Sequence, residues 1–312
     1  MKKKNWNRNR TYLRDWKVVN ERLVVRGEFL LDLDWVENWD KELEEMNAGK
    51  VGRPYDFPES LIKLQAVLSQ WINYRGLEGV ARKLVVYTKL PKYDDYSTIN
   101  RRVNKLSPEI ELPKVGKVNV ACDGSGMKMS NGGEYRTTKY NISQQKRFLK
   151  VIITADPFSK DLLGCEVGVE GDVASEPEVA MSHLKMLIKA GFDVEKFWGD
   201  GSFDVKKLFN LLQRYSILAA IKLPKNACGK ADGSMRRARE VEEFVELGYE
   251  EWASKKRYGR RWTGTEGIFS AVKTIFGEKT RAKTVVGMCR EVERRFWAYQ
   301  GMKGYADSRV SA

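Results

Sequence analysis

The chain has 312 residues, enough for one large domain or two of ordinary size, and 42% of them are hydrophobic, as in a globular protein. Its 56 Lys and Arg residues against 42 Asp and Glu residues give a net charge of +14, which favours a polyanionic partner such as nucleic acid over a merely solvated basic surface. The sequence contains neither an apolar run long enough to span a bilayer nor the apolar part of a signal peptide, so a cytoplasmic protein without a membrane partner is expected.

The cysteines and the histidine limit the kinds of catalytic and metal site that the chain can form. Four scattered cysteines form no CxxC pair, and His183, the single histidine, lies in a stretch with helical periodicity where a surface or packing role is expected. Nucleophilic sites of the Ser-His or Cys-His type and His-rich zinc sites are therefore disfavoured. An enzyme built from this chain is left with carboxylates and a hard metal ion.

The first 112 residues are predicted to be mainly helical. Residues 1–50 are expected to form an irregular arm followed by a helix, and residues 51–112 a small all-helical domain. The apolar periodicity there predicts three helices: from Pro58 to a stop at Gly76, from Leu77 to Tyr87, and from an N-cap at Ser97-Thr98 to Leu106. The last helix is basic. A helix-turn-helix-like unit that contacts DNA through Arg101 and Arg102 is one interpretation, and a dimerisation or bracing domain is the other.

Residues 113–312 are predicted to form an α/β domain. Turn signals separate consecutive antiparallel strands, which are followed by helices that alternate with strands. The strands are expected at 118–122, 134–140, 148–155, 162–169, within 194–201 and at 216–222, and the helices at 175–190 and 204–214.

Asp123 and Asp200 each follow a predicted strand, the first of which is expected to end at Cys122. Because the ligand site of an open α/β sheet lies off the carboxyl ends of its strands, we expect the two aspartates to converge there. A carboxylate at the end of a buried strand needs a cation beside it, and a divalent metal ion is the interpretation adopted for Asp123. The alternative is an aspartate that accepts hydrogen bonds from turn amides.

Residues 224–262 are predicted to be a loop-rich basic insertion. Arg236 and Arg237 in this insertion are expected to contact a nucleic-acid backbone, and a flexible solvated loop is the alternative. The segment Asp232-Gly233-Ser234 is predicted to be a turn. Farther on, Thr263 and Thr265 can cap a helix that carries Glu266 and Lys273 on one side, either as an ordinary surface pair or with Glu266 as a third metal carboxylate.

Three acidic blocks in this order resemble the DDE transposases of prokaryotic insertion sequences. They are Asp123-Gly124, the WGDG segment at 198–201, and RRWTGTEGIFSAVKTIFGE around Glu266. The segments GRPYDFP and YSTINRRVNKL are similar to the N-terminal part of the same family, so the likeness covers roughly residues 52–283.

The resemblance implies a fold, a cofactor and an activity. The fold is a ribonuclease-H-like mixed sheet with flanking helices, preceded by the small helical domain. Two Mg²⁺ or Mn²⁺ ions would be held by Asp123, Asp200 and Glu266. The activity would be cut-and-paste transposition of double-stranded DNA by a nucleoid-associated protein, and a homodimer is expected because two element ends must be brought together.

The family's Tyr-x2-Arg-x3-Glu-x6-Lys signature is matched in part. Tyr258-x2-Arg261 and Glu266-x6-Lys273 fit, but four residues rather than three separate Arg261 from Glu266. The resemblance gives Lys273 and Arg261 the task of holding phosphates near the scissile bond, with Tyr258 as a further DNA contact. Ser125, in the first acidic block, receives no role.

Two other functions remain open. One is a DNA-binding regulator that descends from such an enzyme and no longer cuts, which the presence of all three acids disfavours. The other is a metal-dependent nuclease of the same fold, which the basic insertion and the helical N-terminal region disfavour. An aspartic protease is rejected because its Asp-Thr/Ser-Gly order is reversed here, and a dinucleotide site because Gly124-x-Gly126 lacks the third glycine.

Overall fold

The computed structural model describes residues 15–107, 109–130 and 148–310. The chain divides into two compact units, one made of Met1–Val103 with Ala298–Ala312 and the other of Asn104–Trp297. The long helix α12 (Val285–Val310) contributes residues to both. Among the described residues, no helix combines the length and the apolar character that crossing a membrane requires.

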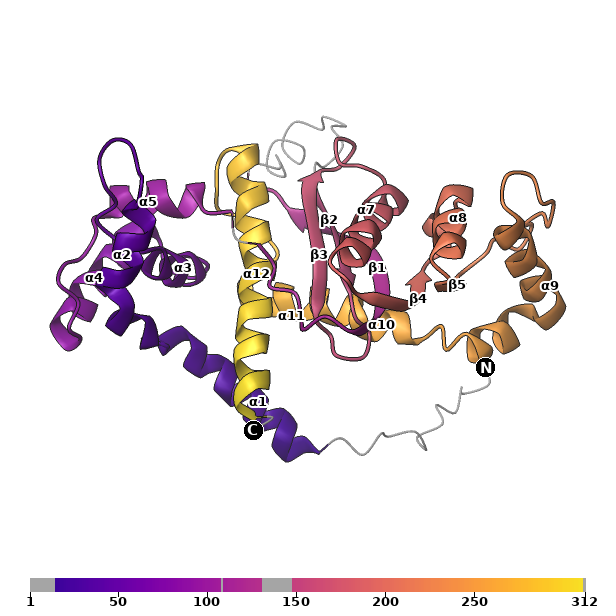
Figure 1. Ribbon diagram of the computed structural model, residues 1–312, viewed down its shortest axis with the longest axis horizontal. Coiled ribbons are helices and arrows are strands. Elements are labelled where there is room, and N and C mark those ends of the chain that lie inside the picture. The colour runs from indigo at the N-terminus through magenta and orange to yellow at the C-terminus, as the bar shows by residue number, and fades with distance from the viewer. Residues whose placement is uncertain (1–14, 108, 131–147, 311–312) are drawn as a thin grey trace, which may run out of the picture. The chain divides into compact units, whose positions relative to one another are not determined.

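The first unit is built from helices (Figure 1). Its elements are α1 (Trp16–Glu28), the 3-10 turns η2 (Phe29–Leu31) and η3 (Asp34–Asn38), α2 (Trp39–Asn47), α3 (Glu59–Leu68), α4 (Tyr74–Tyr87) and most of α5 (Tyr96–Lys105). The expected irregular arm is wrong for residues 16–28, because the Asp15 side chain accepts hydrogen bonds from two amides of the first turn and starts α1. Trp39, Leu61 and Leu90 form a buried cluster in this unit.

The three helices predicted between residues 58 and 106 are present, but three of their boundaries differ: α3 ends at Leu68, α4 begins at Tyr74 and α5 begins at Tyr96. Gly76 does not stop a helix. It lies in the first turn of α4, where its amide donates a hydrogen bond of 2.8 Å to the side chain of the N-cap residue Asn73. At α5 the Asp95 carboxylate, rather than Ser97 or Thr98, accepts from the first free amides, at 2.7 and 3.0 Å. In both cases a strong capping side chain decides where the helix begins.

The second unit is built around a mixed sheet whose described strands have the order β3-β2-β1-β4-β5 (Figure 1). They are β1 (Lys117–Lys128), β2 (Phe148–Ala155), β3 (Leu162–Val169), β4 (Asp193–Gly199) and β5 (Leu218–Ile221). The β1–β2 and β2–β3 pairs are antiparallel, whereas the β1–β4 and β4–β5 pairs are parallel. This arrangement confirms the predicted fold class. The strand predicted at 134–140 lies outside the described residues.

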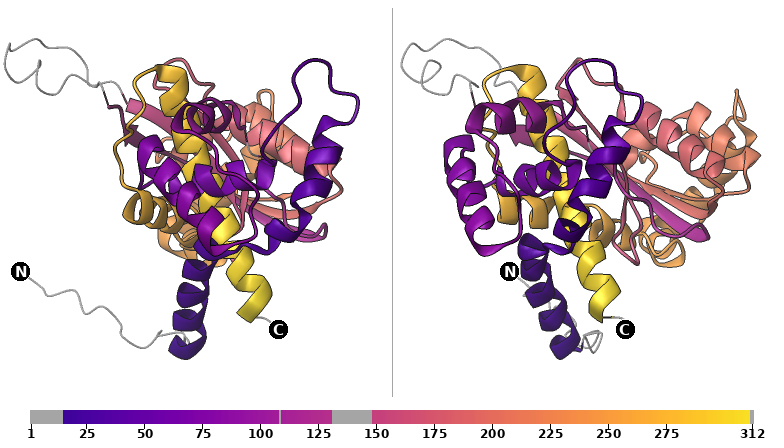
Figure 2. Two further views of the ribbon diagram at one scale, coloured as in Figure 1. Left: turned by 90° about the vertical axis from the view of Figure 1, so that its left-hand side faces the viewer. Right: turned by 60° about the vertical axis from the view of Figure 1, so that its left-hand side comes forward.

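Helices cover both faces of this sheet. They are α7 (Glu176–Lys189), α8 (Lys206–Arg214), α9 (Met235–Lys255), α10 (Arg260–Gly264) and α11 (Glu266–Phe276), with a 3-10 turn η4 (Gly201–Phe203) after β4. The left view of Figure 2 shows α7 on one face and α11 on the other. Val120 and Ile152 of the sheet belong to the same buried apolar core as Leu184 of α7, so burial of these side chains holds the helix against the sheet.

Two predictions in this unit are wrong. The first strand does not end at Cys122, because residues 121–128 continue to pair with 148–155 of β2, and Asp123 lies opposite Ile153 within the strand. The segment 235–255 is not a loop but the helix α9, kinked at Gly248, because Ala238, Val241 and Phe244 form an apolar stripe among the charges. The prediction of a turn at Asp232-Gly233 is confirmed, and Ser234 caps α9.

Candidate active site at the ends of β1 and β4

Asp123 and Asp200 occupy equivalent positions on neighbouring strands. Ala121 of β1 pairs with Trp198 of β4 in parallel register, so each aspartate follows a paired residue by two positions. Residues two apart along a strand face the same side, and neighbouring strands lie about 4.8 Å apart. The structure therefore brings these two carboxylates to one edge of the sheet. Asp123 lies where the parallel pairing ends, although its own strand continues.

The carboxylate of Asp123 is nearly buried, with 14% of its side chain exposed. Burial raises its pKa, and the negative charge of Asp200 raises it further. Three groups oppose this shift: the guanidinium of Arg261 at 3.3 Å, the Gly124 amide at 2.9 Å and the Thr265 hydroxyl at 3.3 Å. A carboxylate in such surroundings favours a nearby positive charge.

Tyr258 and Arg261 extend the site on the α10 side of the sheet. Tyr258 is 3% exposed, and burial raises its pKa to about 12. Its hydroxyl is buried and has no hydrogen-bond partner among the described residues. The Arg261 guanidinium lies 5.6 Å from the centroid of the Tyr258 ring. A protonated phenol without a partner is a donor that a ligand oxygen can satisfy.

Asp200 follows β4 and caps the turn η4. Its Oδ1 accepts a hydrogen bond of 2.8 Å from the amide of Ser202. Asp200 also lines a pocket of about 360 Å³. The other side chains at this pocket combine aromatic rings with positive charge, and they include Lys222, Tyr249, Tyr258, Arg261 and Trp262.

Glu266 is the exposed first residue of α11. It directly follows Thr265, whose hydroxyl contacts Asp123, so the start of α11 is anchored at the site. The described residues contain no group of three or more His, Cys, Asp or Glu side chains already arranged to hold a metal ion. The donor chemistry at Asp123 and Asp200 nevertheless suits a hard divalent cation, because such an ion relieves the repulsion between the two carboxylates.

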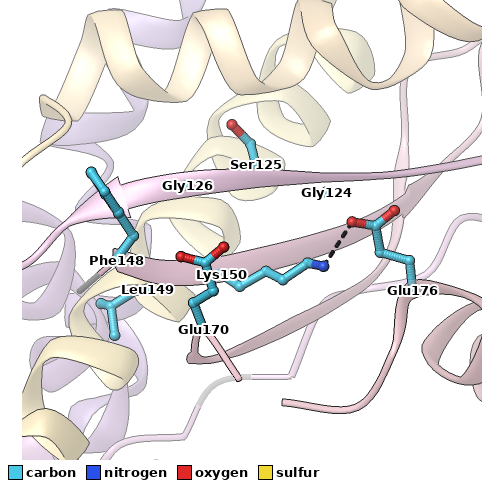
Figure 3. A pocket seen from close by; sticks show the side chains of 8 residues that line it. All are labelled: Gly124, Ser125, Gly126, Phe148, Leu149, Lys150, Glu170 and Glu176. Atoms are coloured by element: carbon cyan, nitrogen blue, oxygen red, sulfur yellow. Dashed lines mark ion pairs between the residues drawn. The ribbon is translucent and has the colours of Figure 1, made fainter. Parts of the chain in front are cut away.

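Lys273 lies two turns after Glu266 on α11 and contacts β1. Its ammonium is 3.1 Å from the Ser125 hydroxyl and 3.4 Å from the carboxylate of Glu278. Ser125 points to the opposite side of β1 from Lys150 (Figure 3). Ser125, to which the sequence assigns no role, therefore anchors Lys273 beside the strand that carries Asp123.

The two arginines predicted to bind DNA from the basic insertion are paired with acids. Arg237 donates two hydrogen bonds of 2.6 and 2.7 Å to the carboxylate of Asp204 and is 15% exposed. Arg236 forms an ion pair of 2.9 Å with Glu240, one turn along α9. The two parallel hydrogen bonds from Arg237 to the Asp204 carboxylate are typical of a contact that stabilises the fold.

The two arginines of α5 differ from each other. Arg102 lies over the ring of Tyr55, at 4.5 Å from its centroid, and donates to the carbonyl oxygen of Phe57 at 3.3 Å. Arg101 is exposed, and among the described residues it donates to Ser97 and Thr98 of its own helix. Arg102 therefore braces the loop before α3, whereas Arg101 presents its charge to solvent.

Sequence reasoning missed Glu176, the first residue of α7. Its carboxylate lies 2.9 Å from the ammonium of Lys150 and 2.8 Å from the hydroxyl of Ser202. The segment Ser175-Glu176-Pro177 predicts a helix start, and an acid in a first helical turn is so common that it indicates no function. His183 is a packing residue: it is 9% exposed and lies 2.8 Å from the Thr154 hydroxyl.

Comparisons with known proteins identify the family. Two family models, both described as a transposase DDE domain, match residues 24–132 and residues 116–300. No curated protein matches the sequence. Among solved structures, the cryo-EM structure of a piggyBac transposase synaptic complex with hairpin DNA matches over 93% of this chain and 82% of that chain, at 10% identity and a TM-score of 0.27. Because the second model spans more than half of the sequence, the chain belongs to the DDE transposase family.

Proposed function

We propose that this transposase serves an insertion sequence: it binds the terminal inverted repeats, cuts DNA at the element's ends and joins the freed 3′-hydroxyl to target DNA. The observation that supports the proposal is that Asp123 and Asp200 each follow the paired residues Ala121 and Trp198 by two positions, with Arg261 beside Asp123. In-line displacement at phosphorus needs groups of this kind, because negative charge develops on both the attacking and the leaving oxygen.

Asp123, Asp200 and Glu266 would hold two Mg²⁺ or Mn²⁺ ions. When bound, such ions stabilise the charge on the attacking and leaving oxygens of the phosphodiester. The chain itself would keep the three carboxylates close to the positions in which they bind the ions. The parallel register of β1 and β4 supports such a position for the two aspartates, and the hydrogen bond from the Thr265 hydroxyl to Asp123 supports it for the start of α11.

Arg261, Lys273 and Tyr258 are proposed to bind phosphates near the scissile bond. Arg261 already neutralises Asp123 and carries further N–H donors. Lys273 is held at β1 by Ser125. Tyr258, with a pKa of about 12, keeps its proton at neutral pH, so its hydroxyl can donate a hydrogen bond to a phosphate oxygen.

Double-stranded DNA is the proposed partner, and a homodimer on paired element ends is the proposed assembly. The net charge of +14 supports binding of a polyanion. Arg101 is exposed and can contact a DNA phosphate directly. Arg102 would first have to leave the Tyr55 ring, and Arg236 and Arg237 their ion pairs with Glu240 and Asp204, before they could bind a phosphate.

Strand cleavage and joining on a duplex that carries an element end, with Mg²⁺ present, test the proposal. Asp123→Asn, Asp200→Asn and Glu266→Gln should each reduce cleavage at least about a thousandfold. Asp232→Asn is the matched control, because it belongs to an Asp-Gly-Ser segment that forms a turn and pairs with Lys206. Undiminished cleavage by Asp123→Asn or Asp200→Asn would overturn the assignment.

The same assay separates the alternatives. Binding of the element end without any strand cleavage would identify a regulator. Cleavage without a joined product would identify a nuclease.

A further inference from the structure

A second charged network reaches Asp200 from the α7 face of the sheet. The Oε1 atom of Glu176 lies 2.9 Å from the Lys150 ammonium, an ion pair that Figure 3 shows beside Gly124. The Oε2 atom lies 2.8 Å from the Ser202 hydroxyl, which is itself 2.6 Å from Oδ1 of Asp200. Lys150, Glu176 and Ser202 therefore form a continuous chain of contacts that ends on Asp200.

Gly124 makes room for this network. A Cβ atom at position 124 would lie 2.5 Å from Oε1 of Glu176, so a larger residue there would displace the carboxylate. With 16% of its side chain exposed, Glu176 is held largely out of solvent. The glycine that follows Asp123 thus permits the approach of Glu176 to the other side of β1.

The network places the Ser202 hydroxyl between two carboxyl groups, of which one, that of Glu176, has an ammonium beside it. A hydroxyl carries one proton, so Ser202 donates to only one of the two carboxylates at a time. Lys150 places its ammonium 2.9 Å from the Glu176 carboxylate, on the side away from the hydroxyl. Oδ1 of Asp200 also accepts from the Ser202 amide, and among the described residues its Oδ2 accepts no hydrogen bond. One oxygen of Asp200 is held and the other stays available.

Capping of α7 does not require Glu176. The capping box is formed by Ser175 and Glu178, whose carboxylate accepts from the Ser175 amide at 3.1 Å and from its hydroxyl at 2.8 Å. Glu178 thus supports the helix, while Glu176, in the same turn, is directed to Ser202.

We propose that Glu176 is a positioning residue of the active site: acting through Ser202 it fixes the carboxylate of Asp200, and Lys150 holds Glu176 in place. The inference rests on the proposed function. Outer groups that orient a ligand carboxylate typically change metal affinity or activity by about 10- to 100-fold when they are removed.

The test measures Mn²⁺ affinity of the DNA-free protein by calorimetry, single-turnover cleavage of an element end, and the midpoint of thermal unfolding. Glu176→Gln and Ser202→Ala should each lower Mn²⁺ affinity and cleavage about tenfold, and Ser202→Thr should retain both. The double variant should lose no more than either single variant, because both act along one path.

Two control variants separate positioning from charge and from stability. Glu170→Gln removes the same charge from the same pocket (Figure 3), and Glu178→Ala removes the side chain that caps α7. Both should keep Mn²⁺ affinity and cleavage within about twofold of wild type, although Glu178→Ala lowers the unfolding midpoint.

Three results would overturn the inference. If the wild-type protein is active and Glu176→Gln binds Mn²⁺ as tightly as the wild type, Glu176 has no positioning role, and the proposed function is unaffected. Additive losses in the double variant would show that Glu176 and Ser202 act separately. A wild-type protein that neither binds Mn²⁺ nor cleaves would refute the proposed function, and the inference with it.

Discussion

The guanidinium of Arg261 lies 3.3 Å from the carboxylate of Asp123, and only 10% and 14% of these two side chains are exposed. The contact joins α10 to β1 across a long separation in sequence. It gives Asp123 a positive neighbour in the absence of any ligand, so the stability of this region depends on the pair.

Arg261→Gln should destabilise the protein by about 3 kcal/mol, because it leaves a buried carboxylate without its cation. The double variant with Asp123→Asn should recover much of that loss, since the charge itself is then gone. Urea denaturation measures both. Arg260→Gln, at the neighbouring position where the guanidinium lies 5.2 Å from the Phe158 ring, is the control and should cost less than about 1 kcal/mol. Equal losses at the two positions would contradict the expectation.

Gly264→Ala should displace α10. A Cβ atom there would lie 2.7 Å from Cα of Pro157, a backbone atom that cannot rotate away. We expect a loss of about 1–3 kcal/mol and reduced strand cleavage, because Arg261 and Glu266 flank this position. The control is Gly267→Ala, whose nearest contact would be 3.9 Å and which should be neutral or stabilising by roughly 0.5–1 kcal/mol in α11. Matching unfolding midpoints for the two variants would refute this account.

His183 should make the stability fall in mild acid. Burial lowers its pKa from 6.5 to about 4, so in this range the unfolded chain binds a proton that the folded chain does not. The free energy of unfolding is therefore unaffected by this histidine above pH 6.5. It falls by up to about 3 kcal/mol as the pH is lowered from 6.5 towards 4. His183→Gln removes the titration while retaining a polar group near Thr154. The difference in unfolding free energy between the two proteins should slope only below pH 6.5, and a flat difference would exclude the effect.

Lys273→Gln should weaken DNA binding for every sequence alike. If its ammonium contacts a phosphate, the slope of log affinity against log salt falls by about 1. Lys207→Gln removes the same charge from an exposed position on α8 and should leave the slope unchanged. Fluorescence anisotropy with an element-end duplex across a salt series measures both. Identical slopes for the two variants would place Lys273 outside the interface.

The sequence predicts the regular parts of the catalytic unit well. β2 and β3 have their expected bounds because their apolar runs end in turn residues such as Asp156-Pro157. The start of α7 is equally clear from Ser175 and Pro177. β1 was harder to predict, because Asp-Gly-Ser-Gly favours a turn locally and only pairing with β2 keeps the strand extended.

The site is predictable only in part, for a related reason. Strand ends indicate Asp123 and Asp200, since parallel strands bring their carboxyl ends to one edge. The contacts of Arg261 with Asp123 and of Glu176 with Ser202 join distant segments and leave no periodic signal. The many charged residues of α9 likewise favour the prediction of a loop, and the helical pattern becomes evident only once Val241 is known to be buried.

From Ala298 onward, α12 belongs to the first unit, where the ring of Tyr299 lies 5.6 Å from the Arg26 guanidinium and Tyr305 packs edge-on against Phe29. During translation, α1 therefore leaves the ribosome long before these partners exist. Residues 16–29 therefore meet these partners only after residues 298–305 have been synthesised, and a ribosome stalled before residue 298 would carry a first unit with exposed hydrophobic surface, which favours aggregation.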